Sequence, residues 1–323
     1  MEFLTHIDIA PFEKKIDHSC HIFSTGSCFA QNIASKLQDA KFQVAASPTG
    51  ILFNPESIAR SIEMLDSKHS ITEDELRCAN GVWFSYNFHS SFSATDKHLA
   101  LEQMQQAIKR GAAALKQADT VIITFGTAWV YRLLERGEVV ANCHKQPHSL
   151  FSRERLSVVE ITERWSKLLA TTLKDKEVIF TVSPIRHLSD GLEQNSLSKS
   201  TLRVAIAELT SLHANAHYFP SFEIMNDELR DYRFYADDMV HPTFLAIDYI
   251  WQRFAQVAIE KESLELIERV KKICQAAAHR PLNPDSESHR AFCRRQLDEI
   301  ERFSLSHPMI DFSKEKEIFV AHL

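Results

Sequence analysis

Along most of the chain, short apolar runs that end near a glycine or proline alternate with longer segments of helical periodicity. The apolar runs have strand length and cover residues 21–24, 42–45, 121–125, 177–182 and 216–219. Between them, apolar residues recur every three or four positions over residues 30–40, 55–65, 97–117, 157–173 and 196–213. This alternation predicts an α/β fold, in which helices cover both faces of a mostly parallel sheet and reactive groups gather beyond the carboxyl ends of the strands.

Two departures from the alternation predict added elements. Residues 129–132 and 138–142 surround Arg136-Gly137 and are typical of a hairpin inserted after the third strand, where it could wall a pocket. After residue 242 the pattern is helical over residues 245–261, 262–278 and 286–303, with a proline-containing break at 280–284. We therefore expect a domain over residues 1–280 and a C-terminal helical extension over residues 281–323.

Charge and composition argue against several classes of function. The net charge of −6 supplies no basic field for nucleic acid or an anionic membrane surface. No run reaches the roughly 18 apolar residues of a membrane span, and the N-terminus lacks the pattern of a secretory signal, so we expect a cytoplasmic protein. The six cysteines form no CxxC pair and the histidines no HxH or HExxH spacing, so we expect no disulfide framework, no metal and no cofactor. The oligomeric state is not specified by the sequence.

The turn at Gly26-Ser27-Cys28 carries the first candidate for chemistry. It joins the end of the first predicted strand to a helix, and the N-terminal end of that helix would direct free N–H groups at the turn. Either Ser27 or Cys28 could be a nucleophile, and the helix end would lower the pKa of the Cys28 thiol. A helix cap at Ser27 beside a core cysteine is the alternative interpretation.

Asp238 and His241 form the second candidate. Their spacing lets the carboxylate orient the imidazole and stabilise its protonated form, which is the arrangement of a general base that activates a nucleophile. A surface Asp-His pair is the alternative. His144, Arg186 and His187 follow predicted strands and could bind an anionic part of a substrate, although each alone is more often a surface residue.

The Gly-Ser-Cys-Phe-Ala string at residues 26–30 and the Asp238, His241, Pro242 string together resemble the GSCFA-domain family of the SGNH (GDSL-like) hydrolase superfamily. The resemblance extends from the first predicted strand to about Pro242 and includes short motifs at residues 49–55, 125–131, 142–145 and 183–187. It implies a three-layer α/β/α sandwich of the flavodoxin-like SGNH type, to which the C-terminal helical extension is added.

The resemblance also implies roles for single residues. In GDSL-like enzymes the first block reads Gly-Asp-Ser, so the register favours Cys28 as the nucleophile, while Ser27 stands in the Asp position and remains the second choice. The amides of Gly50 and Cys28 would hold the oxyanion. The third block normally supplies an asparagine after its glycine, but Gly126 is followed by Thr127 and Ala128. Its replacement candidates are Asn142 and Asn54.

These features predict an esterase that works by acyl transfer on a small or O-acetylated ester, such as a saccharide ester. Two alternatives stay open: an acyltransferase that passes the acyl group to a saccharide, and a catalytically weak module that binds a glycan or a protein.

Overall fold

A five-stranded parallel sheet forms the centre of the computed structural model, which describes residues 5–323. Its strands are β1 (His21–Gly26), β2 (Gln43–Ala46), β5 (Thr120–Phe125), β9 (Glu177–Val182) and β10 (Ala216–Tyr218), in the spatial order β10-β9-β5-β1-β2. Counting only these strands, the order is 2-1-3-4-5, that of flavodoxin-like doubly wound sheets. The order reverses between β1 and β5, so a crevice is expected beyond the carboxyl ends of these two strands.

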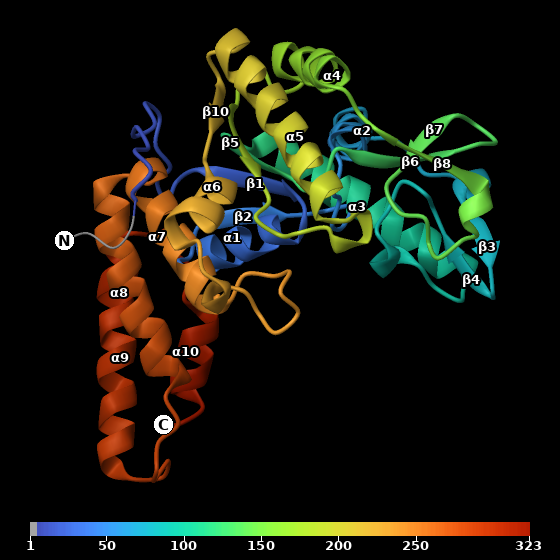
Figure 1. Ribbon diagram of the computed structural model, residues 1–323. Helices are drawn as coiled ribbons and strands as arrows, with labels where there is room; N and C mark the ends of the chain where they lie inside the picture. The colour runs from blue at the N-terminus through green and yellow to red at the C-terminus, as the bar shows by residue number, and fades with distance from the viewer. Residues whose placement is uncertain (1–4) are drawn as a thin grey trace.

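Helices cover both faces of this sheet, which confirms the predicted α/β layers (Figure 1). One face packs against α2 (Pro55–Asp66), α3 (Lys97–Gln117), α4 (Val158–Ala170) and α5 (Leu192–Leu212). The other face packs against α1 (Cys28–Asp39), α7 (Phe244–Ala258) and the helical segment Ile224–Leu229. The short helix α6 (Ser221–Glu223) places Phe222 against the core of the first face. Side chains alternate along each strand, so β1 sends Ile22 to the second face and Phe23 to the first.

Two small antiparallel sheets lie to one side of the central sheet, at the right of Figure 1. One is the hairpin of β3 (Arg77–Ala79) and β4 (Val82–Phe84). The other contains the predicted hairpin, β6 (Trp129–Leu133) with β7 (Glu138–Val140), and adds a third strand, β8 (Phe151–Arg155), on the other edge of β6. The inserted hairpin is therefore confirmed as part of a three-stranded sheet.

The C-terminal helices extend away from the α/β layers, at the lower left of Figure 1. They are α8 (Lys261–Ala278), α9 (Glu287–Ser306) and α10 (Ser313–Val320). They have a core of their own that joins Val270 and Ile273 of α8 to Phe303 of α9 and Phe319 of α10. Residue 280, the predicted boundary, lies in the connection between α8 and α9. No helix within residues 5–323 is long and apolar enough to cross a membrane.

Candidate functional site

A cavity of about 460 Å³ lies beyond the carboxyl ends of β1, β5 and β9. Its walls come from the turn after β1, the loops after β5 and β9, the segment before α7, and the inserted sheet. Most of the residues singled out in the sequence line it: Ser27, Cys28, Asn54, Asn142, Arg186, His187 and His241. The fold thus brings together segments that are far apart in the sequence, at the edge of the sheet where an α/β protein binds ligands.

Gly26 gives the turn after β1 its shape. Its φ is +136°, and a Cβ there would lie 2.2 Å from the carbonyl oxygen of Thr124 on the neighbouring strand. Ser27 follows in extended conformation and caps α1 only through its backbone, because its hydroxyl makes no cap hydrogen bond. The Ser27 Oγ is buried and has no hydrogen-bond partner among the described residues. A buried hydroxyl without a partner is costly, and this one belongs to a residue that lines the cavity.

Cys28 is the first residue of α1, and its side chain lines the cavity while it also packs against the core beneath α1. Burial raises the pKa of the Cys28 thiol above its ordinary value. The prediction that the helix N-terminus lowers the pKa of Cys28 is therefore wrong, because removing the thiolate from water raises this pKa by more than the helix end lowers it. The Cys28 N–H has no acceptor within the helix, as at the start of any helix, so it remains able to bind an oxyanion.

Asp238 and His241 lie in a tight loop before α7. The Asp238 Oδ2 is 2.6 Å from the His241 Nδ1, and the Asp238 Oδ1 accepts hydrogen bonds from the N–H groups of Val240 and His241 at 2.9 Å each. These bonds hold the pKa of the Asp238 carboxyl low, at about 2. The imidazole is thereby fixed by its Nδ1, which leaves Nε2 as the free nitrogen of a side chain that lines the cavity.

The loop after β9 places Arg186 and His187 at the cavity. The Arg186 guanidinium stacks 4.0 Å from the ring centre of Tyr235, so it also fastens the loop before α7. The His187 ring stands edge-on to Phe53, with ring centres 5.9 Å apart. Burial, followed by the charges of nearby basic side chains including Lys199, lowers the pKa of His187 to about 4. A neutral His187 cannot attract an anion by its charge, so its ring could bind an anionic group only by donating a hydrogen bond.

Two glycines of the family motifs do not offer their amides to the cavity. The Gly50 N–H donates to the Ser47 carbonyl at 2.8 Å, and Gly50 is not among the residues that line the cavity. The Gly126 N–H donates to the Phe53 carbonyl at 2.7 Å. The structure therefore does not place Gly50 as an oxyanion donor, because its N–H is used to close a turn.

The two asparagines differ in what they can donate. Asn54 is the N-cap of α2: its Oδ1 accepts the Ser57 N–H at 2.8 Å, which leaves its Nδ2 hydrogens for the cavity that it lines. The Asn142 Oδ1 accepts the His144 N–H at 2.7 Å within its own loop. Of the two, Asn54 sits on the more rigid element, since a helix cap fixes its side chain.

His144 does not line the cavity. Its ring stacks on Phe84 with ring centres 4.3 Å apart, and its Nε2 lies 2.9 Å from the carbonyl oxygen of Ser85. The expectation that His144 binds an anionic substrate group is therefore not met in the structure, where the ring joins the β3–β4 hairpin to the loop after β7.

The sequence analysis missed a polar face on the first turns of α5, made by Asn195, Ser198 and Lys199. The Asn195 Oδ1 accepts the His187 N–H at 3.0 Å, and the Ser198 Oγ accepts the Ala128 N–H at 2.7 Å. The Lys199 Nζ donates to the carbonyl oxygens of Gly126 and Ser183 at 2.6 and 2.7 Å. One helix face thus holds the loops after β5 and β9 together beneath the cavity.

Asn195 lies in the first turn of α5, which has Gly191 as its N-cap. The spacing of Asn195, Ser198 and Lys199, three and four residues apart, continues the apolar positions Leu202 and Ile206. Polar residues on the buried face of a helix are the signal that could have identified them.

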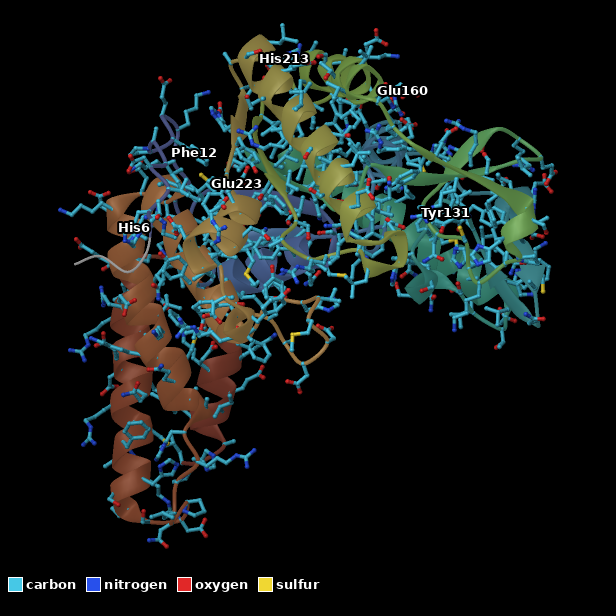
Figure 2. The ribbon with its side chains drawn as sticks, in the orientation of Figure 1. His6, Phe12, Tyr131, Glu160, His213 and Glu223 are labelled. Carbon is cyan, nitrogen blue, oxygen red and sulfur yellow. The ribbon has the colours of Figure 1, made fainter. Side chains whose placement is uncertain are left out.

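The inserted sheet supplies the wall of the cavity away from the turn after β1. The Arg153 guanidinium lies 5.1 Å from the Trp129 ring centre and 5.3 Å from that of Tyr131, and it pairs with Asp190 in the loop after β9. Figure 2 shows Tyr131 among the side chains of this sheet. All four residues line the cavity, so an aromatic and cationic surface faces the candidate catalytic groups.

Residues 5–323 contain no group of three or more His, Cys, Asp or Glu side chains that could hold a metal ion.

The sequence model described as "GSCFA family" matches residues 21–254, which include every wall of the cavity. The chain belongs to the GSCFA family. A second model, "GSCFA domain protein, C-terminal domain", matches residues 270–323, which cover the second half of α8 together with α9 and α10. A search of the curated proteins gave no match. In this GSCFA-family protein, the Gly-Ser-Cys-Phe-Ala motif is therefore the turn from β1 into α1, at the edge of the cavity.

Proposed function

We propose that this GSCFA-family protein is an esterase of the SGNH type, which cleaves a small or O-acetylated ester by acyl transfer. One observation carries the proposal: the turn Gly26-Ser27-Cys28 and the Asp238-paired His241 line the same cavity, although they lie near opposite ends of the matched family region. A nucleophile, a base and a carboxylate that orients the base are the parts that acyl transfer requires.

In the proposed reaction, the His241 Nε2 takes the proton of Cys28 or Ser27 as the sulfur or oxygen forms a bond to the ester carbonyl carbon. The carbonyl π electrons move to its oxygen, where the Cys28 N–H binds the negative charge. When the charge returns, the bond to the alcohol oxygen breaks and His241 gives its proton to the departing alcohol. Water, deprotonated by His241, then releases the acid and restores the nucleophile.

The experiment is turnover of p-nitrophenyl acetate by the wild type, His241→Ala and a matched control, His148→Ala, whose side chain is exposed in a nearby loop. We expect the His241 variant to lose at least about 100-fold in kcat, because general base catalysis contributes about that much. The control should keep the wild-type rate. Equal rates in the wild type and His241→Ala would refute this site, and no wild-type turnover on any acyl ester would favour a module that only binds.

A second candidate, transfer of the acyl group to an acceptor alcohol, is favoured by the wall made of Trp129, Tyr131 and Arg153. Aromatic faces beside a cation form a surface on which a saccharide ring can stack, and the cavity is larger than an acetyl group needs. Acylated saccharide as the main product, when an acceptor is added to the assay, would select the transferase. Free acid alone would select the esterase.

A further inference from the structure

The Nε2 of His187 is buried and has no hydrogen-bond partner among residues 5–323. A Cβ built on Gly126 would lie 3.4 Å from this atom and 3.2 Å from the Cβ of Ser27. The His187 Nε2 and the Ser27 Cβ therefore lie close to the same point beside the Gly126 α-carbon, where a side chain would fit tightly. The Ser27 Oγ is the second buried polar atom without a partner at this place.

Ser27 and His187 both line the cavity, and each has a buried polar atom without a partner among residues 5–323, which costs free energy of folding. The surroundings fix where His187 points. Its backbone N–H is bonded to Asn195 of α5, and its ring stands edge-on to Phe53. The neighbouring Arg186 N–H lies 3.4 Å from the Val240 carbonyl, which joins this loop to the loop of His241. The ring is thus held between the motif turn and the candidate base.

The asparagine donor of the third SGNH block is absent from this chain. Ala128 stands where the third SGNH block has its asparagine; it is fully buried and does not line the cavity, and its N–H is already bonded to Ser198. The amides of Gly50 and Gly126 are used by backbone carbonyls. Of the oxyanion donors that the superfamily pattern supplies, only the Cys28 N–H remains able to bind the charge, and the Asn54 Nδ2 is a further donor at the same cavity.

We propose that His187 is a catalytic residue that stays neutral and donates its Nε2–H to the carbonyl oxygen of the ester, in place of the missing third-block asparagine. The inference rests on the proposed esterase or acyltransferase function and adds a role to the same cavity. His187 neither gains nor loses a proton in this role: it binds the oxygen as negative charge develops there. Its low pKa, about 4, agrees with a ring that is neutral throughout the working range, and Lys199 beneath Gly126 contributes to lowering it.

A neutral donor and a second base make different predictions for one substitution. Glutamine keeps an N–H donor near the position of Nε2 but cannot accept a proton, whereas alanine keeps neither. If His187 donates, His187→Ala loses about 100-fold in kcat with little change in KM, the loss expected for one oxyanion donor, and His187→Gln recovers most of it. If His187 acts as a base, the glutamine variant is as slow as the alanine variant.

The experiment measures kcat and KM for p-nitrophenyl acetate and for its thiono analogue, in which sulfur replaces the carbonyl oxygen. A carbonyl sulfur accepts hydrogen bonds poorly, so the wild type should prefer the oxygen ester, and His187→Ala should lose much of that preference. A merely structural change lowers both rates together. His148→Gln is the matched control, because His148 is exposed and outside the cavity, and thermal unfolding of each variant checks the fold.

The outcomes separate the two proposals. Full kcat and an unchanged preference for the oxygen ester in His187→Ala overturn the role of His187 and leave the esterase standing. Equally slow Gln and Ala variants also overturn it, in favour of a base. Absence of turnover in the wild type, with no effect of His241→Ala, refutes the esterase and this inference with it.

Discussion

The Nζ of Lys199 lies 2.6 Å from the carbonyl oxygen of Gly126. The first turns of α5 therefore hold the loop of Gly126, the residue that lies beside both Ser27 and His187. Lys199 is fully buried, and both of its acceptors are backbone carbonyls. No carboxylate compensates for its charge at either bond, and burial lowers its pKa to about 7. Burial of Lys199 therefore costs free energy of folding, and its two hydrogen bonds fix the loops that form the floor of the cavity.

The first prediction concerns the stability of the protein as a function of pH. An unfolded lysine binds its proton up to about pH 10.4, whereas Lys199 in the folded protein releases it above about 7. In this window the unfolded state binds more protons, so raising the pH stabilises the fold, and lowering it through 7 removes that stabilisation. Urea unfolding should show the wild type gaining on the order of 1 kcal/mol per pH unit over Lys199→Met between about pH 7 and 9. If the free energies of unfolding of the wild type and Lys199→Met changed in parallel with pH, the prediction would be wrong. Lys109→Met is the control, because Lys109 is exposed on α3.

The second prediction concerns the Asp238–His241 pair. Asparagine at 238 can still accept the two backbone N–H groups but carries no charge and can present its NH₂ to Nδ1, which would reverse the imidazole tautomer. Asp238→Asn should therefore lose about 10²- to 10⁴-fold in kcat. Asp237→Asn, a neighbouring exposed carboxylate, should keep the wild-type rate. A loss of the same size in both variants would mean that the general charge of the loop, rather than the pair, matters.

The low pKa of Asp238 also sets a limit on acid inactivation. Its carboxylate stays charged until the pH approaches about 2, so the stability that this group contributes is complete above about 4, the pKa of a free Asp, and is lost as the pH falls toward 2. Protonation of Asp238 therefore does not account for any loss of activity between pH 4 and 6.

The sequence predicted all the strands of the central sheet. In β1, β5 and β9, burial on both faces leaves short, nearly continuous apolar runs, whereas the partly exposed edge strands β2 and β10 were found from short runs that end before Gly50 and Pro220. It did not predict β8, where Arg153 and Arg155 interrupt any apolar run, because their environment is decided by contacts with Trp129 and Thr201 from other elements. The helix α10 was also not predicted. Its buried Glu315 is paired with Lys41, a contact that local periodicity does not reveal.

The residues of the candidate site were also predicted only in part. Ser27, Cys28 and His187 could be found because they come directly after strands, which end at a common edge. The position of His144 could not, because its ring is held by the distant Phe84 and Ser85. The N–H of Gly50 closes a local turn with the carbonyl of Ser47, three residues earlier, which the short motif did not reveal.

The third prediction tests the turn before the motif serine. Gly26→Ala would place a Cβ 2.2 Å from the Thr124 carbonyl at a φ of +136°, where no small movement of a side chain can relieve the clash. We expect a loss of about 3 kcal/mol or more in the free energy of unfolding, measured with urea. Gly137→Ala is the control: its φ is +67° but nothing lies within 4 Å, so about 1 kcal/mol is expected. Similar losses at both positions would show that φ alone, and not the contact with β5, constrains Gly26.

The fourth prediction decides between Cys28 and Ser27 as nucleophile. Burial raises the pKa of the Cys28 thiol, so iodoacetamide should label it slowly at neutral pH and faster only in alkaline solution, while the exposed Cys78 labels first. If Cys28 is nevertheless the nucleophile, His241 must create the thiolate as substrate binds. Cys28→Ser should then lose most of kcat and Ser27→Ala little.

The reverse pattern, a loss in Ser27→Ala with near-normal Cys28→Ser, would assign the nucleophile to Ser27. The unpaired Oγ of Ser27 would then be explained by catalysis, and the thiol by packing beneath α1. Rapid labelling of Cys28 below pH 7 that disappears in His241→Ala would contradict the slow labelling expected here. It would show that a thiolate–imidazolium pair already exists in the free protein, because only a nearby positive charge can offset the burial of the sulfur.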